Sequence, residues 1–211
     1  MDVENAILNR RSVRSYRSDK SVSNETIAEI LDLARFAPSS GNLQNWKVIL
    51  VSDPGRKEEL ASAALKQKWI TTSPVLLVIC NNKADVKRLY KDRGESLYSI
   101  QNVAVFTNNI LLAANNLGLS TCWIGAFDPD AVKMVLRIPE GVEPEAIIAL
   151  GHAAEELEAP SRKTIDQFTF FETWGNVEKS FNVFEKGKAK IGEVKSKGKS
   201  FFSKIFGKKK Y

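Results

Sequence analysis

Apolar residues recur along the chain at two different spacings, so the sequence predicts both helices and strands. Spacings of three and four residues predict a short helix over residues 3–8, a helix over 24–36 that begins after Ser23 as N-cap, and a helix over 56–69. A longer helix is predicted from about residue 96 to 117. It is apolar over most of its circumference, and we therefore expect it to be buried at the centre of the fold.

Four extended apolar segments predict strands. They are residues 45–52, 73–81, 120–127 and 145–153. The segment 73–81 is apolar almost without interruption, so we expect it to be buried on both faces. Gly118 suits the end of the long helix, and Asp128 followed by Pro129 suits the start of another. Taken alone, the alternation of helices and strands is typical of a parallel, doubly wound sheet.

Charge is distributed unevenly along the chain. The net charge is +6, but residues 186–211 hold ten lysines and one glutamate, which leaves residues 1–185 with 21 basic and 24 acidic side chains. The sequence therefore predicts a folded domain over residues 1–185 and a basic, flexible C-terminal tail over 186–211. Because the excess of basic residues does not lie on the folded part, we expect no binding of nucleic acid.

The end of the tail has two open interpretations. Residues 201–211 place three phenylalanines and an isoleucine beside four lysines, which suits weak contact with an anionic membrane surface. The alternative is a disordered extension that keeps the protein in solution. No apolar run is long enough to cross a bilayer, and the N-terminus lacks the positive charge of a signal peptide, so we expect a cytoplasmic protein.

Cysteine and histidine exclude several chemistries. Cys80 and Cys122 each lie inside an apolar run, which predicts reduced, buried thiols rather than a disulfide. His152 is the single histidine of the sequence, so a metal site with more than one imidazole is excluded, and we predict no metal site. We interpret His152, at the end of a strand, as a hydrogen-bonded structural residue.

Four polar motifs are suited to one kind of ligand. Residues 10–16, RRSVRSY, offer guanidinium groups and hydroxyls that can bind a phosphate, although such a cluster can also be a solvated face. Residues 38–46, PSSGNLQNW, combine hydroxyls, a glycine and three side-chain amides that suit the edge of a heteroaromatic ring. In residues 123–127, WIGAF, the glycine would let a flat ring lie against the backbone. Residues 161–163, SRK, add two cations; each motif could also be a loop, a cap or a core turn.

The order of these motifs along the chain, together with SPVLLVIC, the long helix and IIALGHA, resembles the FMN-dependent nitroreductase family. The resemblance covers about residues 3–175. It implies an α+β fold, with a nitroreductase-like mixed β-sheet flanked by helices, instead of a parallel doubly wound sheet. It also implies an intertwined homodimer with two FMN sites at the subunit interface.

The resemblance assigns residues to the FMN phosphate and to both ends of the flavin. Arg10 and Arg162, from opposite ends of the folded part, would hold the phosphate, with Lys163 beside Arg162. Ser12 would bind ribityl or phosphate oxygens, and Arg11 would contribute through its backbone as much as through its side chain. Arg14 would lie near the pyrimidine end of the ring, where it acts electrostatically.

Further contacts are implied from three other segments. The segment expected to approach from the partner subunit contributes Pro38, Ser39, Ser40, Asn42 and, as a further contact, Gln44. The backbone N–H groups of Ile124 and Gly125 would point toward flavin N5 and the neighbouring carbonyl. Gln67 would provide an amide to the edge of the ring.

The function that the resemblance implies is that of an NAD(P)H-dependent oxidoreductase. FMN would pass a hydride from NADH or NADPH to a nitroaromatic, a quinone or a similar small acceptor in a ping-pong mechanism, and no side chain need act as a catalytic group. An alternative stays open, in which the protein is a non-catalytic flavin-binding module that acts as a sensor or FMN carrier. The charged segment 83–96 has Tyr90 as its single aromatic residue and does not suggest an extended lid.

Overall fold

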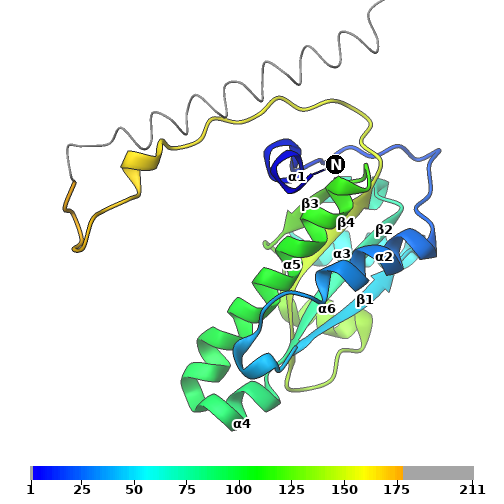
Figure 1. Cartoon of the computed structure of the whole chain (residues 1–211). Helices are drawn as coiled ribbons and strands as arrows, with labels where there is room; N and C mark the ends of the chain where they lie inside the picture. Colours follow the sequence, from blue (N-terminus) through cyan, green and yellow to red (C-terminus); the bar gives the residue numbers. More distant parts are fainter. Residues whose placement is uncertain (1, 178–211) are drawn as a thin grey trace, which may run out of the picture. The chain divides into compact units, whose positions relative to one another are not determined.

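The structure is a computed structural model that describes residues 2–177 (Figure 1). These residues belong to two units, 2–159 and 160–177, and each unit is described by itself. The predicted domain boundary at residue 185, the flexible tail over 186–211 and the membrane contact through 201–211 lie outside the described residues and stay predictions. Within the described part, no helix has the length and apolarity that crossing a membrane requires.

The first unit is built on a four-stranded sheet. The strands β1 (Trp46–Val51), β2 (Val75–Asn82), β4 (Val142–Gly151) and β3 (Ser120–Ile124) lie side by side in this order, and every adjacent pair is antiparallel. Among the described residues, one parallel pairing is present, an isolated bridge between Ser12 and Thr121 of β3. The α+β class is confirmed, and the parallel doubly wound sheet that the alternation of elements suggests is wrong.

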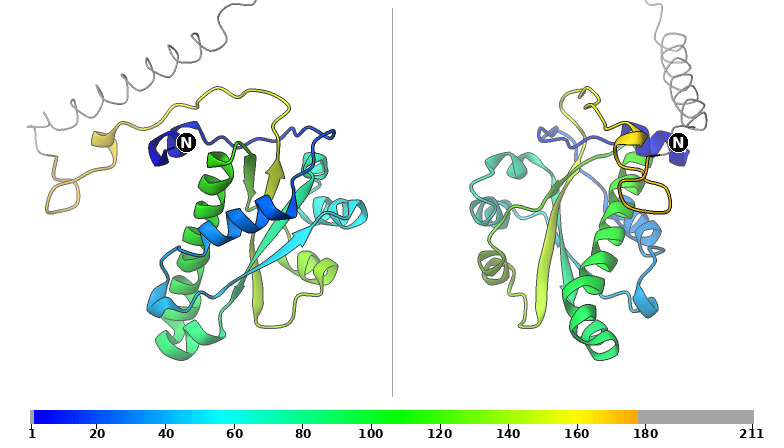
Figure 2. Two further views of the ribbon diagram at one scale, coloured as in Figure 1. Left: turned by 45° about the vertical axis from the view of Figure 1, so that its right-hand side comes forward. Right: turned by 90° about the vertical axis from the view of Figure 1, so that its left-hand side faces the viewer.

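Helices cover both faces of the sheet (Figure 2). On one face α2 (Asn24–Ala34) and the long α5 (Ser99–Asn116) pack against the sheet. On the other face lie α3 (Pro54–Ala63) and α6 (Pro129–Leu136). The short α1 (Val3–Asn9) contacts α5.

Strand β2 shows why a continuous apolar run did not reveal the strand direction. Its alternate side chains divide between the two cores, with Leu77 and Ile79 on the α2 and α5 side and Leu76 and Val78 on the α3 and α6 side. All four are fully buried. The predicted burial on both faces is confirmed, but it follows from two helical layers and is independent of whether the strands are parallel.

Helix boundaries follow the caps that the sequence predicts. The Ser23 hydroxyl accepts a hydrogen bond from the N–H of Thr26 at the start of α2. The Asp128 carboxylate caps α6, whose first residue is Pro129. Gly118 follows α5 in the left-handed conformation, with φ of +77°. These interactions satisfy backbone groups that have no partner inside the helix.

The predicted helix over 56–69 is wrong at its C-terminal end. Helix α3 ends at Ala63, Leu65 and Lys66 adopt positive φ, and a short 3-10 helix, η2 (Lys68–Thr72), follows. The buried Lys57 holds this turn, because its Nζ donates to the carbonyl oxygens of Thr71 at 3.2 Å and Ser73 at 2.8 Å. Burial lowers the pKa of Lys57.

The sequence pattern does not predict one helix, which is rich in charged residues. Helix α4 (Ala84–Arg93) buries Val86 and otherwise exposes or half-buries its side chains, so it lacks the apolar stripe that predicts a helix. A π-helical turn, η3 (Gly94–Tyr98), joins it to α5. The long helix therefore begins at Ser99 instead of at about residue 96.

The second unit has little regular structure within residues 160–177. It contains one 3-10 turn, η4 (Ile165–Gln167), which a capping box between Thr164 and Gln167 closes at its start. The rings of Phe170 and Trp174 lie with their centroids 5.0 Å apart.

Candidate functional site

The arginine motif is an extended segment held against the edge of the sheet. Ser12 pairs with Thr121 at the start of β3, and the Val13 N–H donates to the Thr121 carbonyl oxygen at 3.0 Å. Tyr16 is 5% exposed, and its hydroxyl donates to the carbonyl oxygens of Val13 at 2.9 Å and Ala149 at 3.1 Å. The backbone of residues 12–16 is thereby fixed against β3 and β4.

Burial along this segment decides which side chains are available to a ligand. Val13 and Tyr16 are buried in the core, whereas Ser12 and Arg14 are exposed and Arg10 is half-buried. Burial raises the pKa of the Cys122 thiol, and the positive charges of Arg14 and Arg10 act in the opposite direction.

One further predicted residue, Gln67, lies in the turn region that contacts this segment through Trp69. The Gln67 side chain donates from Nε2 to the carbonyl oxygen of Ala126 at 3.1 Å, which ties the start of η2 to the turn after β3. The Arg14 guanidinium lies 5.9 Å from the centroid of the Trp69 ring. The structure thus brings the arginine segment, Gln67 and the turn at residues 124–126 together on one surface of a single chain.

This surface is positively charged. Within residues 2–177, neither Arg10 nor Arg14 forms an ion pair with a carboxylate, although the neighbouring Arg17 pairs with Asp19 at 2.7 Å. A pair of guanidinium groups without an acidic partner is suited to an anionic ligand.

Arg11 is oriented differently from its neighbours. Its guanidinium donates from Nη1 to the carbonyl oxygens of Leu8 at 2.7 Å and Arg10 at 3.0 Å. These bonds satisfy backbone groups at the end of α1. The side chain is therefore used within the chain, and the predicted ligand contact of Arg11 rests on its backbone.

The second predicted segment, residues 38–44, is a compact loop. The Ser39 hydroxyl accepts from the Gln44 N–H at 3.1 Å, and Gln44 Nε2 donates to Asn42 Oδ1 at 3.0 Å. Pro38, Asn42 and Gln44 are exposed. The sequence predicts that the amides of Asn42, Gln44 and Asn45 suit the edge of a ring. This prediction is wrong for Asn45, which is 4% exposed and bonds to residues inside the fold.

This loop lies far from the arginine segment of the same chain (Figure 1). Ser40 contacts Asn102 in the first turn of α5, whereas Asn115 in its last turn donates to the carbonyl oxygen of Ala6 in α1. With a rise of about 1.5 Å per residue, these two contacts are roughly 20 Å apart along α5. The two predicted halves of the site therefore lie at opposite ends of one helix.

The predicted cations of the C-terminal segment belong to the second unit. Arg162 and Lys163 are exposed, and Arg162 Nη1 donates to the carbonyl oxygen of Ser161 at 3.2 Å. Their convergence with Arg10 stays a prediction. The His152 backbone oxygen accepts from the Arg17 N–H at 2.9 Å. A hydrogen bond of the His152 side chain stays a prediction. Cys80 and Cys122 are buried, free thiols, as predicted.

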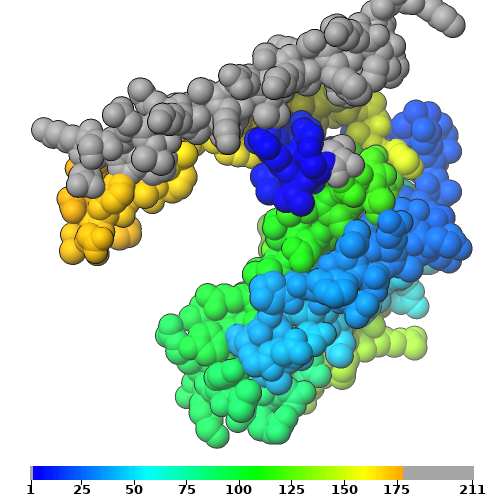
Figure 3. Space-filling model, viewed as in Figure 1, coloured from blue at the N-terminus to red at the C-terminus, as the bar shows by residue number. Residues whose placement is uncertain are grey.

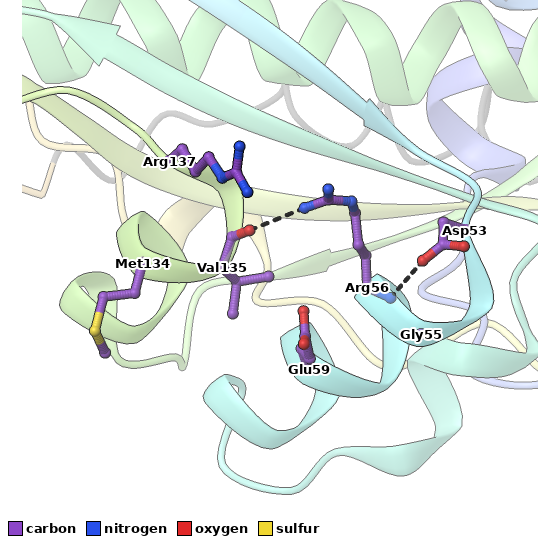
Figure 4. Close-up of a pocket in the computed structure, with 7 residues that line it drawn as sticks. All are labelled: Asp53, Gly55, Arg56, Glu59, Met134, Val135 and Arg137. Atoms are coloured by element: carbon purple, nitrogen blue, oxygen red, sulfur yellow. Dashed lines mark hydrogen bonds between the residues drawn. The ribbon is translucent and has the colours of Figure 1, made fainter.

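A surface hollow between α3 and α6 is separate from these residues. It has a volume of about 540 Å³, and its lining residues are shown in Figure 4. Arg56 crosses it and donates from Nη1 to the carbonyl oxygen of Val135 at 3.1 Å. None of the predicted site residues lines this hollow.

Two residues that contact the predicted site residues are not predicted from the sequence. Trp69 was assigned to a regular helix, and its place beside Arg14 depends on the turn after α3. Asn102 is a polar residue within the buried face of α5, a signal that could have drawn attention to it. Its contact with Ser40 joins residues that are 62 positions apart.

Comparison with known proteins shows to which family this chain belongs. The sequence matches the Nitroreductase family model over residues 7–70 and 55–152. It is 30% identical over 183 residues to the NADH dehydrogenase of Thermus thermophilus, a match that covers 74% of this chain and 89% of that protein. An FMN reductase (NADPH) of Bacillus subtilis is 31% identical over 161 residues, which cover 70% of this chain and 64% of that protein.

A solved structure agrees with this assignment. The NfrA1 nitroreductase from B. subtilis matches with a TM-score of 0.74 at 25% identity, over 98% of this chain and 86% of that one. The chain belongs to the nitroreductase family, which confirms the resemblance that the order of its motifs indicates.

The anchoring of the arginine segment by Tyr16 can be tested by removing one hydroxyl. We expect Tyr16→Phe to lower the free energy of unfolding by about 1–2 kcal/mol, because two carbonyl oxygens lose a buried donor. Urea denaturation measures this loss. The control is Tyr98→Phe, which removes a hydroxyl from the exposed bond to Arg93 and should cost less than about 0.5 kcal/mol. Equal losses in the two variants would show that the Tyr16 hydroxyl does not anchor the segment.

Proposed function

We propose that this chain is an FMN-dependent oxidoreductase that takes a hydride from NADH or NADPH and passes it to a small acceptor, such as a nitroaromatic or a quinone, in a ping-pong cycle. The observation that carries the proposal is that Arg14 lies over the Trp69 ring, two residues after Gln67, whose side chain bonds to the turn after β3. The names of the relatives, FMN reductase and NADH dehydrogenase, support the same class of reaction.

The residues of this surface fit FMN. A phosphate needs donors with positive charge, and Arg10 and Arg14 have no acidic partner within the described residues. A flat ring needs an open stretch of backbone. Gly125 is exposed, and a Cβ added there would meet no atom nearer than Trp123 Nε1 at 3.7 Å. The backbone at Gly125 is therefore accessible to a ring on that side.

When bound, FMN supplies the redox chemistry, and the chain supplies binding, orientation and electrostatics. Arg10 would hold the phosphate, with the exposed Ser12 hydroxyl beside it. Arg14 places a permanent positive charge where it stabilises negative charge that develops on a bound ring. Gln67, already bonded to the backbone of Ala126, fixes the turn whose N–H groups face the ring. None of these roles requires a protein nucleophile.

The proposed site is completed by a second copy of the chain. Residues 38–44 lie roughly 20 Å along α5 from the arginine segment of their own chain. A two-fold axis that sets two α5 helices antiparallel would bring the loop of each chain to the arginine segment of the other, because such an interface uses the same patch on both copies. The separation within one chain therefore supports the homodimer.

An apolar surface is available for this association. The helical layer of α1, α2 and α5, which faces the viewer in Figure 3, carries several large apolar side chains that are between 39% and 73% exposed. They are Val3, Ile7, Leu33, Phe36, Ile100 and Val105. Apolar side chains exposed on this layer would be covered where two copies pack against each other.

Two cheap observations test the reaction. We expect the purified full chain to be yellow and to lose its visible flavin absorbance when NADPH is added without oxygen, because bound FMN would supply the redox chemistry. A chain that is yellow but does not bleach with NADPH or NADH would support the non-catalytic binding module instead. A chain that stays colourless after incubation with FMN would overturn both.

Mixed dimers test whether each site uses two chains. We expect Arg10→Ala and Ser39→Trp each to lose FMN, the first through the phosphate and the second because a bulky ring occupies the predicted contact. In a mixed dimer of the two variants, one site carries both substitutions and the other carries neither, so about half of the wild-type flavin should return. Tandem-tag purification and flavin absorbance measure this. If each site were built from one chain, both sites would stay defective and no flavin would return.

Arg14 tests the electrostatic part of the proposal. We expect Arg14→Ala to reduce kcat/KM by roughly 100-fold, since a fixed donor to developing charge is worth about 3 kcal/mol. Steady-state kinetics with NADPH and a quinone measure the change. Arg17→Ala is the matched control, because Arg17 lies three residues away and its charge is paired with Asp19. An equal effect of both substitutions would contradict a specific role for Arg14.

A further inference from the structure

The loop at residues 38–44 has an unusual backbone. Gly41, Asn42 and Gln44 have φ of 56°, 55° and 46°, so three of four consecutive residues adopt the left-handed conformation. Residues other than glycine adopt it rarely, and such a backbone persists when the surrounding structure holds it. The loop therefore needs a support that is built into the fold.

Asn102 of α5 provides that support from both ends of the loop. Its Oδ1 accepts hydrogen bonds from the Ser40 N–H at 2.9 Å and the Ser40 hydroxyl at 3.2 Å. Its Nδ2 donates to Oδ1 of Asn45 at 2.8 Å. The Asn102 side chain is buried, with 4% of the residue exposed. One amide thus joins the start of the loop to the residue that follows it.

The Asn102 amide belongs to a head-to-tail chain of buried amides. Asn45 Nδ2 donates to Asn81 Oδ1 at 2.7 Å, and Asn81 Nδ2 donates to Oε1 of Glu145 at 2.8 Å. Ser99 braces the chain from α5, since its backbone oxygen accepts from Asn45 and its hydroxyl accepts from Asn81. We call the series Ser40, Asn102, Asn45, Asn81 and Glu145 the amide chain.

The amide chain has one direction, and Glu145 sets it. A carboxylate accepts hydrogen bonds and does not donate them, so Asn81 must present its NH₂ group to Glu145 and its oxygen to Asn45. The orientation of the Asn81 amide fixes that of Asn45, which in turn fixes that of Asn102. Asn102 Oδ1 therefore faces the two donors of Ser40. Successive hydrogen bonds in a buried series also strengthen one another.

Helix α4 closes over the loop from another side. A Cβ added at Gly41 would lie 2.9 Å from the Tyr90 hydroxyl oxygen and 3.2 Å from Leu89 Cδ2. The loop is therefore held between α4 and the amide chain, while Pro38 and Asn42 are exposed. A binding segment that already has its bound shape loses less conformational freedom when the ligand arrives.

We propose that Asn102 is a positioning residue that fixes the loop at residues 38–44 for the flavin bound mainly by the other chain of the dimer. This inference rests on the proposed function. Asn102 itself does not touch the flavin; it acts through Ser40 and Asn45. Its substitution should therefore damage the site of the partner chain more than the site built on its own arginine segment.

The first test is Asn102→Leu in the full chain, with Asn109→Leu as control. Leucine has a similar volume but cannot continue the amide chain, and we expect the Kd for FMN, measured by fluorescence quenching, to rise about tenfold or more. Asn109 lies on the same helix and makes one long bond, 3.5 Å, to Ala34, so its substitution should change the Kd by less than about twofold. If Asn102→Leu does not fold, Asn102→Ala is used instead. It removes the same bonds, and alanine is the most favourable residue in a helix.

The second test separates positioning from a general loss of structure. In mixed dimers of Asn102→Leu with Arg10→Ala, one site combines both defects and the other combines two intact halves. We expect about half of the wild-type flavin to return with wild-type Kd. A structural defect confined to the Asn102→Leu chain would spoil its own arginine segment, and no flavin would return.

The outcomes are distinct. A tenfold rise in Kd for Asn102→Leu together with recovery in the mixed dimer supports the inference. Wild-type protein that binds FMN while Asn102→Leu and Asn109→Leu have equal Kd values, or a mixed dimer without flavin, overturns this inference and leaves the oxidoreductase in place. Wild-type protein that binds no FMN overturns the proposed function and this inference with it.

Discussion

The pairing of β2 with β4, buried on both faces, is the constraint on which the rest of the structure depends. Helices cover each face, and both strands contribute apolar side chains to both cores. A polar group placed on either face would lose its hydration without a partner, so the groups that can bind a ligand are confined to edges and strand ends. The arginine segment runs along the edge at β3, and the loop at residues 38–44 precedes β1.

Helix α5 then determines how these polar regions are spaced. Most of its inward positions are apolar, but Asn102 near its start bonds to the loop and Asn115 near its end bonds to α1. The helix that fills the core therefore also keeps the two halves of the proposed site apart. The hollow between α3 and α6 is lined by none of the predicted site residues. The proposed site is an open surface on each chain and would gain its second wall from a symmetric copy.

The chemistry proposed for this surface needs charge and order more than it needs reactive side chains. Arg10 and Arg14, which pair with no carboxylate among residues 2–177, offer a place for an anion, and an open backbone at Gly125 offers a place for a flat ring. The loop that would face that ring keeps a strained backbone because buried amides hold it. Rigid support of this kind is what a cofactor site requires, since the cofactor supplies the reaction and the protein supplies its geometry.

The sequence by itself determined the local elements and their chemistry: the apolar spacing of α2 and α5, the caps at Ser23 and Asp128, and the cationic and amide-rich motifs. These depend on residues within a few positions of one another, which is why spacing could predict them. The tertiary structure decided the antiparallel order of the strands, the end of α3 at Ala63, and the inward turn of Asn45, because each is settled by partners far along the chain. The bond between Ser40 and Asn102 spans 62 positions, and no periodicity in the sequence can encode a contact of that range.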